Sequence, residues 1–402
     1  MSILAKSRAG CSAAAFAVLL NAGAAHARDN LSVVVGTGVS AGTNPYLSIG
    51  SDTGALSAYL DVAPYWSMDD EVSTVVLRGS ARVERFTNLD STNTSALASL
   101  AVTRRLSDTV SLRGGADFKT DKASAQDILN GRTNGGDPVP GAGPPFNDVS
   151  FVGGRSRTTT MTARVGATFS LSDQSSIDGD VSAGSYRYRD SSLADYRFAS
   201  QRLGYSSVLT ERTTLTANLD LEEVDYLGRR PGDSLIVTPL VGLSRQLSET
   251  TNASFSAGVS VSRLRQVDGS YDRTTGLALR GRLCNETVRG RICADVDRSS
   301  QPTALGDVRL VTSLAASASM RLNQRDSFLL TASGSRTSES GGISRGRSAT
   351  FAGASAELSR QVSPRVALFG SLAYADIFDA GVARRASLQV RIGAQYRFGA
   401  TQ

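Results

Sequence analysis

Apolar and polar side chains alternate along most of this chain, in runs separated by short polar segments. In residues 72–84, Val75, Leu77 and Val83 occupy one side of an extended chain, whereas Arg78 and Arg82 occupy the other. A period of two is typical of a β-strand whose two faces meet different surroundings. Because the alternation recurs along the chain, we expect an all-β fold in which each strand has one apolar face and one polar face.

Polar tetrads that begin with leucine separate neighbouring runs. Examples are residues 106–109 (LSDT), 171–174 (LSDQ), 247–250 (LSET) and 358–361 (LSRQ). Short polar turns between alternating runs are typical of antiparallel hairpins. The chain therefore predicts a repeated order of strand, tight turn, strand and longer loop.

About eighteen runs fit the chain, each of roughly 10 to 16 residues, the length of a tilted strand that crosses a membrane. Backbone groups in lipid must be paired within the sheet, so such a sheet has to close. We predict a transmembrane antiparallel up-and-down β-barrel of about eighteen strands, with about sixteen as the alternative, and with termini and tight turns on the periplasmic side. The expected strand starts are Leu31, Ala55, Val72, Ser95, Val110, Arg157, Ser176, Leu193, Thr213, Ser234, Asn252, Thr274, Arg291, Val308, Ser327, Arg347, Arg365 and Arg384.

The polar face of each run would line a water-filled lumen in such a barrel. Arginine is in excess over carboxylates among these residues, so we expect a mild preference for anions. The candidate pore-lining residues are Arg78, Arg82, Glu84, Arg113, Asp117, Arg164, Asp178, Asp180, Asp220, Glu222, Arg321, Arg391 and Arg397.

Aromatic residues fall near the ends of several runs, where amphipathic rings would meet lipid headgroups. Tyr65, Trp66, Tyr396 and Phe398 lie near the expected periplasmic ends, and Phe86, Tyr188, Tyr226 and Phe378 near the outer ends.

The N-terminus has the pattern of a secretory signal peptide. Lys6 and Arg8 precede a short apolar stretch at residues 12–20, and residues 25–27 (AHA) form a small-x-small cleavage site. We expect residues 1–27 to be removed and residues 28–402 to form the barrel. After residue 27 there is no apolar run long enough for a transmembrane helix.

Charge is spread thinly rather than clustered. The formal net charge of +6 falls to about +4 without Lys6 and Arg8. The arginines stand singly on alternating runs and are accompanied by acidic residues, whereas nucleic-acid binders concentrate basic residues with interleaved aromatics. Nucleic acid is therefore excluded as an expected partner.

Catalytic chemistry is poorly represented. The sole histidine, His26, belongs to the expected signal peptide, so the mature chain offers no histidine base, Ser-His couple or histidine metal ligand. Asp178 and Asp180 form a carboxylate pair, but alternating lumen charges account for it. We expect neither an enzyme nor a cofactor or metal site.

Cys284 and Cys293 flank a short polar segment between two alternating runs. In an oxidising compartment such a pair is expected to form a disulfide at the base of one hairpin. A metal or redox pair is the alternative, and it lacks a neighbouring histidine or acidic cluster.

Residues 121–155 form the longest connection and are rich in proline and glycine. One interpretation is a loop that folds into the lumen as a constriction, with charges at Asp127, Arg132, Asp137, Asp148 and Arg155. The other is an outer loop that covers the mouth. The sequence leaves both open.

The chain ends in residues 391–398 (RIGAQYRF), whose spacing of Gly393, Tyr396 and Phe398 resembles the C-terminal signal for insertion of bacterial outer-membrane barrels. With the Leu-Ser-Asp-type turns and the Cys284–Cys293 hairpin, the mature chain resembles the outer-membrane β-barrel porins of Gram-negative bacteria. It is similar to uncharacterised barrels often encoded near exopolysaccharide-export genes. The resemblance implies an outer-membrane location, contact with lipid and lipopolysaccharide, and handling by the barrel-insertion machinery.

Three functions are compatible with these features. The first is a passive, porin-like aqueous pore for small hydrophilic solutes or ions. The second is an outer-membrane component of exopolysaccharide export, which would need polysaccharide-export proteins as partners. The third is a structural barrel without an open channel. A transporter with an energised plug is disfavoured, because the first strand begins within a few residues of the expected cleavage site.

Overall fold

The computed structural model describes residues 28–47, 54–87, 92–122, 157–190, 192–228, 232–265, 269–337, 348–379 and 385–399. Within these ranges the chain forms eighteen β-strands and no helix. The predicted strand starts agree with the observed ones to within three residues. The strands are β1 (Arg28–Thr43), β2 (Ala55–Asp69), β3 (Ser73–Phe86), β4 (Thr92–Arg105), β5 (Val110–Lys122), β6 (Arg157–Ser172), β7 (Ser175–Tyr188), β8 (Asp195–Thr210), β9 (Thr213–Leu227), β10 (Gly232–Gln246), β11 (Thr251–Arg265), β12 (Tyr271–Thr287), β13 (Gly290–Pro302), β14 (Val308–Arg321), β15 (Asp326–Thr337), β16 (Ala349–Ser363), β17 (Val366–Asp379) and β18 (Ser387–Gly399).

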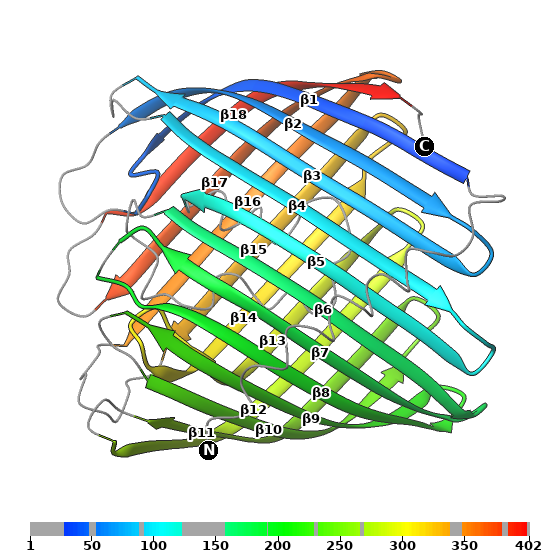
Figure 1. Cartoon of the computed structure of the whole chain (residues 1–402). Helices are drawn as coiled ribbons and strands as arrows, with labels where there is room; N and C mark the ends of the chain where they lie inside the picture. The colour runs from blue at the N-terminus through cyan, green and yellow to red at the C-terminus, as the bar shows by residue number, and fades with distance from the viewer. Residues whose placement is uncertain are drawn as a thin grey trace.

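Each strand pairs antiparallel with its neighbours in sequence, and the sheet closes on itself (Figure 1). The closing ladder joins β1 to β18 and runs from Ser32 opposite Gly399 to Thr43 opposite Leu388. Every described strand therefore has two partner strands, although the ladder between β12 and β13 covers only residues 279–287 of β12. The predicted closed antiparallel barrel is confirmed.

Most of the recurring leucine tetrads form the short turns at one end. The tetrad at residues 358–361 is an exception, because it lies within β16 and the turn after it is built around Ser363. The backbone N–H of Leu106 donates to the carbonyl of Val110 (2.9 Å), and the bonds of Leu247 to Thr251 (2.8 Å) and Leu322 to Asp326 (2.9 Å) repeat this geometry. In the tetrads that form turns, the polar residue after the leucine accepts a hydrogen bond from the backbone N–H two residues later, as in the Asn323–Arg325 turn (2.8 Å). These local bonds explain why the tetrads look alike.

The two faces of the sheet differ in chemistry. Directly paired residues of antiparallel strands point to the same side, so the registers assign every strand position to one face. The outward positions carry large apolar side chains that remain exposed, such as Leu60 (51%), Val241 (61%) and Ile392 (62%). The inward positions carry mainly charged, hydroxyl and small residues, together with buried apolar side chains such as Phe351 and Ile377 near one end. An apolar exterior around a polar interior is the arrangement expected of a barrel in lipid.

Among the described residues, no helix has the length and apolar character needed to cross a membrane.

The expected aromatic positions divide between the two faces. Trp66, Phe378, Tyr396 and Phe398 point outward, and the Tyr396 and Phe398 rings lie 4.5 Å apart. Tyr65, Phe86, Tyr188 and Tyr226 point inward instead, which corrects their assignment to a headgroup belt. Phe86, for example, is buried against Tyr46, with the ring centroids 5.6 Å apart. Phe86, Tyr188 and Tyr226 contact inward-folded connections, whereas the Tyr65 ring centroid lies 5.8 Å from the Arg78 guanidinium carbon on the inner wall.

Candidate functional site: the inward face of the barrel

The thirteen candidate pore-lining residues all occupy inward positions. The strand registers pair inward residues directly across neighbouring strands. Arg82 lies opposite Asp61, Arg113 opposite Gly166, and Asp180 opposite Arg202, and the same face continues around the barrel to Arg391 opposite Ser40. Arg321 and Arg397 lie on the same face near the short turns. The registers show which way these side chains point. That ions pass along them remains a prediction.

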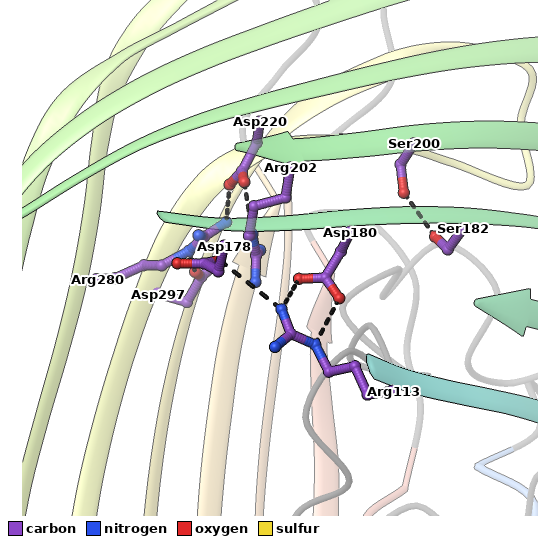
Figure 2. Close-up of polar contacts among 9 residues, drawn as sticks. All are labelled: Arg113, Asp178, Asp180, Ser182, Ser200, Arg202, Asp220, Arg280 and Asp297. Atoms are coloured by element: carbon purple, nitrogen blue, oxygen red, sulfur yellow. Dashed lines mark hydrogen bonds and ion pairs between the residues drawn. The ribbon is translucent and has the colours of Figure 1, made fainter. Parts of the chain in front are cut away.

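Arg113 on β5 holds two carboxylates of β7. Its Nε donates to Asp180 Oδ1 (2.8 Å) and its Nη2 to Asp180 Oδ2 (2.5 Å), while Nη2 lies 3.8 Å from Asp178 Oδ2. Nη1 also donates to Thr168 on β6 (2.8 Å). Figure 2 shows the Arg113 side chain directed toward both carboxylates. The fork geometry fixes the guanidinium more firmly than a one-point ion pair would.

Two glycines make room for this cluster. A Cβ on Gly166 would collide with the Asp180 carboxylate and the Arg113 guanidinium, and a Cβ on Gly204 would collide with the Asp178 carboxylate. Both glycines point inward on strands adjacent to β7. The ionic side chains therefore lie flat along the wall.

A second chain of ion pairs extends from β8 to β13. Arg202 Nε donates to Asp220 Oδ1 (2.6 Å), and Asp220 Oδ2 lies 2.8 Å from Arg280 Nη2. Arg280 Nε in turn donates to Asp297 Oδ2 (3.2 Å). Arg280 reaches from β12 past β11 and β10 to β9, and these intervening strands present small inward residues, including Gly242 and Gly258. Figure 2 shows this second chain beside the Arg113 cluster.

These ion pairs are in contact with solvent. The Arg113 and Asp180 side chains are 40% and 31% exposed, and Arg202 is 44% exposed. Other inward pairs are Arg282 with Asp295 (2.6 Å) and Arg164 with Asp117 (3.8 Å). Charges inside a closed sheet are costly to hold in an apolar medium. Their exposure indicates that the inner wall borders water.

A third polar cluster lies at the seam between β1 and β18. The Arg82 and Arg391 guanidinium carbons lie 4.1 and 4.8 Å from the ring centroid of Tyr59. Glu84 accepts hydrogen bonds from Ser57 (2.5 Å) and from Ser40 (3.3 Å). The cluster joins side chains of β1, β2, β3 and β18.

Three connections fold into the barrel at the end opposite the short turns. We call residues 44–47, 192–194 and 303–307 the mouth bridge. Leu47 and Ala304, both fully buried, pack together with inward residues of β16 and β17, including Phe351 and Ile377. Leu193 packs against the same cluster from the connection before β8. Because β8 and β17 stand opposite each other in the ring, the mouth bridge crosses the lumen.

Hydrogen bonds hold the mouth bridge in place. The Ala194 N–H donates to the Ala304 carbonyl (2.7 Å), which joins two of its segments. The Tyr226 hydroxyl donates to the Asp307 carbonyl (2.6 Å), and the Asp307 carboxylate pairs with the buried Arg309 guanidinium (2.9 Å). The bridge is thus anchored to the inner wall at β9 and β14.

The mouth bridge was not predicted from the sequence. The segment expected to supply a constriction, residues 121–155, lies outside the described residues except for its first two positions. A short signal for one bridge segment was present at residues 303–307 (TALGD), where Gly306 takes a φ of 81° that favours glycine. The sequence of this turn did not indicate which residues it would contact.

Cys284 and Cys293 form the expected disulfide. They are directly paired on β12 and β13, with their Cα atoms 4.1 Å apart, and the bridge is buried on the inward side near the short turns.

The residues of the expected insertion signal lie on both faces of β18. Tyr396 and Phe398 point outward, whereas Gly393 points inward and faces Gly38 of β1. Their role in insertion stays a prediction.

No known protein-family model and no curated protein matches this chain. Among solved structures it is similar to the FrpB iron transporter from Neisseria meningitidis, with a TM-score of 0.48 and 7% identity over 92% of this chain and 81% of that chain. It is also similar to OccAB4 of Acinetobacter baumannii (TM-score 0.43, 9% identity, 93% and 98% covered) and to OpdL of Pseudomonas aeruginosa (0.42, 11%, 92% and 99%). At these identities and TM-scores, the similarities carry no information about solute or mechanism. Over the residues that the structure describes, the protein is a closed antiparallel all-β barrel with an apolar outer wall and a charged inner wall.

Proposed function

We propose that the protein is a porin-like barrel of the bacterial outer membrane, which lets small hydrophilic solutes or ions pass passively. The observation that carries this proposal is the solvent-exposed ionic wall inside a sheet whose exterior is apolar. A barrel of this strand number is wide enough to contain water. Exposed carboxylates and guanidinium groups on the inner wall favour a hydrated passage rather than a tightly packed interior.

The mouth bridge favours small solutes over a polymer. A polysaccharide chain passing outward would have to move past Leu47 and Ala304, which are buried in contacts that cross the lumen. Ions and small solutes would need only a narrow gap beside the bridge. The export function therefore requires displacement of this bridge, whereas the passive pore does not.

The distribution of charge refines the expected anion preference. Arg113, Arg202 and Arg280 are each balanced by carboxylates, so they contribute little net field. Arg321 and Arg397 lie at exposed inward positions near the short turns. We infer that these two residues carry the anion preference, because unbalanced charge at a pore entrance attracts counter-ions.

The test is conductance of the purified, refolded protein in a planar bilayer under a potassium chloride gradient. We expect stepwise currents and a reversal potential that indicates mild anion preference. The variant Arg321→Gln/Arg397→Gln should keep the steps and lose the preference, while the control Arg245→Gln, on the outward face, should retain it. Absence of steps from protein that shows heat-modifiable mobility on gels would refute the pore and favour a structural barrel.

A further inference from the structure

Arginines gather on the outward face of the barrel, at the end opposite the short turns. The registers place Arg187, Arg197, Arg263, Arg265, Arg273 and Arg336 at outward positions close to that end, and all of them are exposed. A charged side chain that faces hydrocarbon is costly, so these residues have to lie above the apolar belt. Their level corresponds to the headgroups of one leaflet.

Three of these arginines, Arg263, Arg265 and Arg273, form a compact group with Tyr271 on β11 and β12, which we call the basic patch. Arg263 lies directly opposite Arg273, and Arg265 lies directly opposite Tyr271. Like charges directly opposite each other destabilise a strand pair. On its other side Arg263 lies opposite the apolar Leu235. The charge of Arg265 is partly offset by Asp233, whose Oδ2 lies 3.9 Å from Arg265 Nη1. The Arg263–Arg273 pair therefore has the charge and spacing to share an anion.

The geometry around the basic patch supports a fixed site. The Arg263 guanidinium lies over the Tyr271 ring, with 3.7 Å between its central carbon and the ring centroid. This cation–π contact restricts the side chain through the face of the guanidinium, whereas an acceptor would bind the N–H groups at its edge. Planar guanidinium groups match the oxygen spacing of a phosphate.

The apolar belt begins immediately below the basic patch. The next outward pair along the two strands is Val261 and Thr275, followed by Val259 and Leu277, which are exposed. A ligand with a phosphate at the level of the arginines and acyl chains beside Val259 and Leu277 would satisfy both surfaces.

We propose that the basic patch binds the phosphate of a phosphorylated glycolipid in the outer leaflet, of the lipid A type. The proposal rests on the outer-membrane location proposed above. Arg263 and Arg273 share the phosphate oxygens, Arg265 adds charge at the same level, and Tyr271 holds Arg263 in position. The phosphate removes the repulsion between the two opposed arginines.

The test compares the full barrel in detergent micelles with two double variants. Binding of bisphosphorylated lipid A is titrated by native mass spectrometry to wild type, to Arg263→Gln/Arg273→Gln, and to the control Arg104→Gln/Arg245→Gln at the outward face of the opposite end. Loss of the charge-assisted bonds should weaken binding by about tenfold or more in the first variant. The control should bind as wild type does. Equal binding by all three proteins, or an equal loss in both variants, overturns the proposal.

Two further arms identify the source of the phosphate. Lipid A from which the phosphates have been removed should bind wild type as weakly as the first variant binds the intact lipid. Inorganic phosphate should compete poorly, because it lacks the acyl chains, and equally tight binding of inorganic phosphate would refute the lipid assignment. Heat-modifiable mobility shows that each variant is folded. Conductance is measured on the same samples, so a silent barrel that binds lipid A refutes the pore alone, and a conducting barrel that does not bind it refutes the lipid site alone.

Discussion

Gly38 of β1 pairs directly with Gly393 of β18 at the seam that closes the barrel. The Tyr59 side chain extends from β2 over both glycines, because a Cβ on Gly38 or Gly393 would lie 2.6 or 2.7 Å from its hydroxyl oxygen. Gly393 thus has a packing role at the seam that is separate from its place in the expected insertion signal. One aromatic side chain covers the junction of the first and last strands.

Replacing Tyr59 by alanine should weaken the closed barrel. The change removes a buried ring and its contacts with Arg82 and Arg391, at a cost of about 3 kcal/mol. The midpoint of heat-induced unfolding, followed by gel mobility of unheated and heated samples, should fall. Tyr205→Ala is the control, because Tyr205 is an exposed outward residue. An equal shift in both variants would argue against a special role of the seam.

Arg113→Gln should shift the ion selectivity of the pore toward cations. Asp178 and Asp180 lose their shared counter-charge in this variant and remain on a solvent-exposed wall. The reversal potential in a salt gradient measures the change. Asp180→Asn should shift it in the opposite direction. If neither variant changes the reversal potential, ions do not pass along this wall.

Leu47→Asp should open the mouth bridge. An ionised carboxylate in the cluster with Phe351 and Ile377 is unfavourable without a partner, so this segment should leave its position. Single-channel conductance should rise, while ion selectivity should change little. Val288→Asp, at a fully exposed position in a short turn, is the control. Unchanged conductance in Leu47→Asp would show that the bridge does not limit flow.

Removing the disulfide should lower stability without changing the fold. Replacing Cys284 and Cys293 by alanine frees a short hairpin loop in the unfolded chain, a loss of roughly 2–3 kcal/mol by the loop-entropy relation. The midpoint of heat-induced unfolding should decrease, and reductant should have no further effect on the variant. A wild-type midpoint that is insensitive to reductant under unfolding conditions would contradict this expectation.

The sequence was sufficient for the strands and their two faces. Val75, Leu77 and Val83 alternate with Arg78 and Arg82, and a period of two can only be satisfied by placing the two sets on opposite sides of a sheet. The leucine tetrads marked the turns because their bonds are local, as from Leu106 to Val110. Local patterns therefore predicted the strand order and the closed ring.

Contacts between distant segments could not be predicted in this way. Ala194 and Ala304 meet through a backbone hydrogen bond, and neither residue carries a side-chain signal for that contact. Phe86 and Tyr226 lie near strand ends, as headgroup aromatics do, yet their registers turn them inward. The period of two already places Phe86 on the face of Glu84 and Tyr226 on the face of Glu222, so the error came from using position along the strand instead of the face.

The mouth bridge also has a mechanical consequence. A ring of hydrogen-bonded strands resists stretching along its circumference but flattens readily into an ellipse, because small changes of twist between neighbours suffice. Contacts from Leu193, beside β8, through Ala304 and Leu47 to the wall at β17 fix one diameter of that ring. In the proposed membrane location, lateral pressure from the bilayer would therefore deform the opposite end first, where the described turns are short and do not cross the lumen.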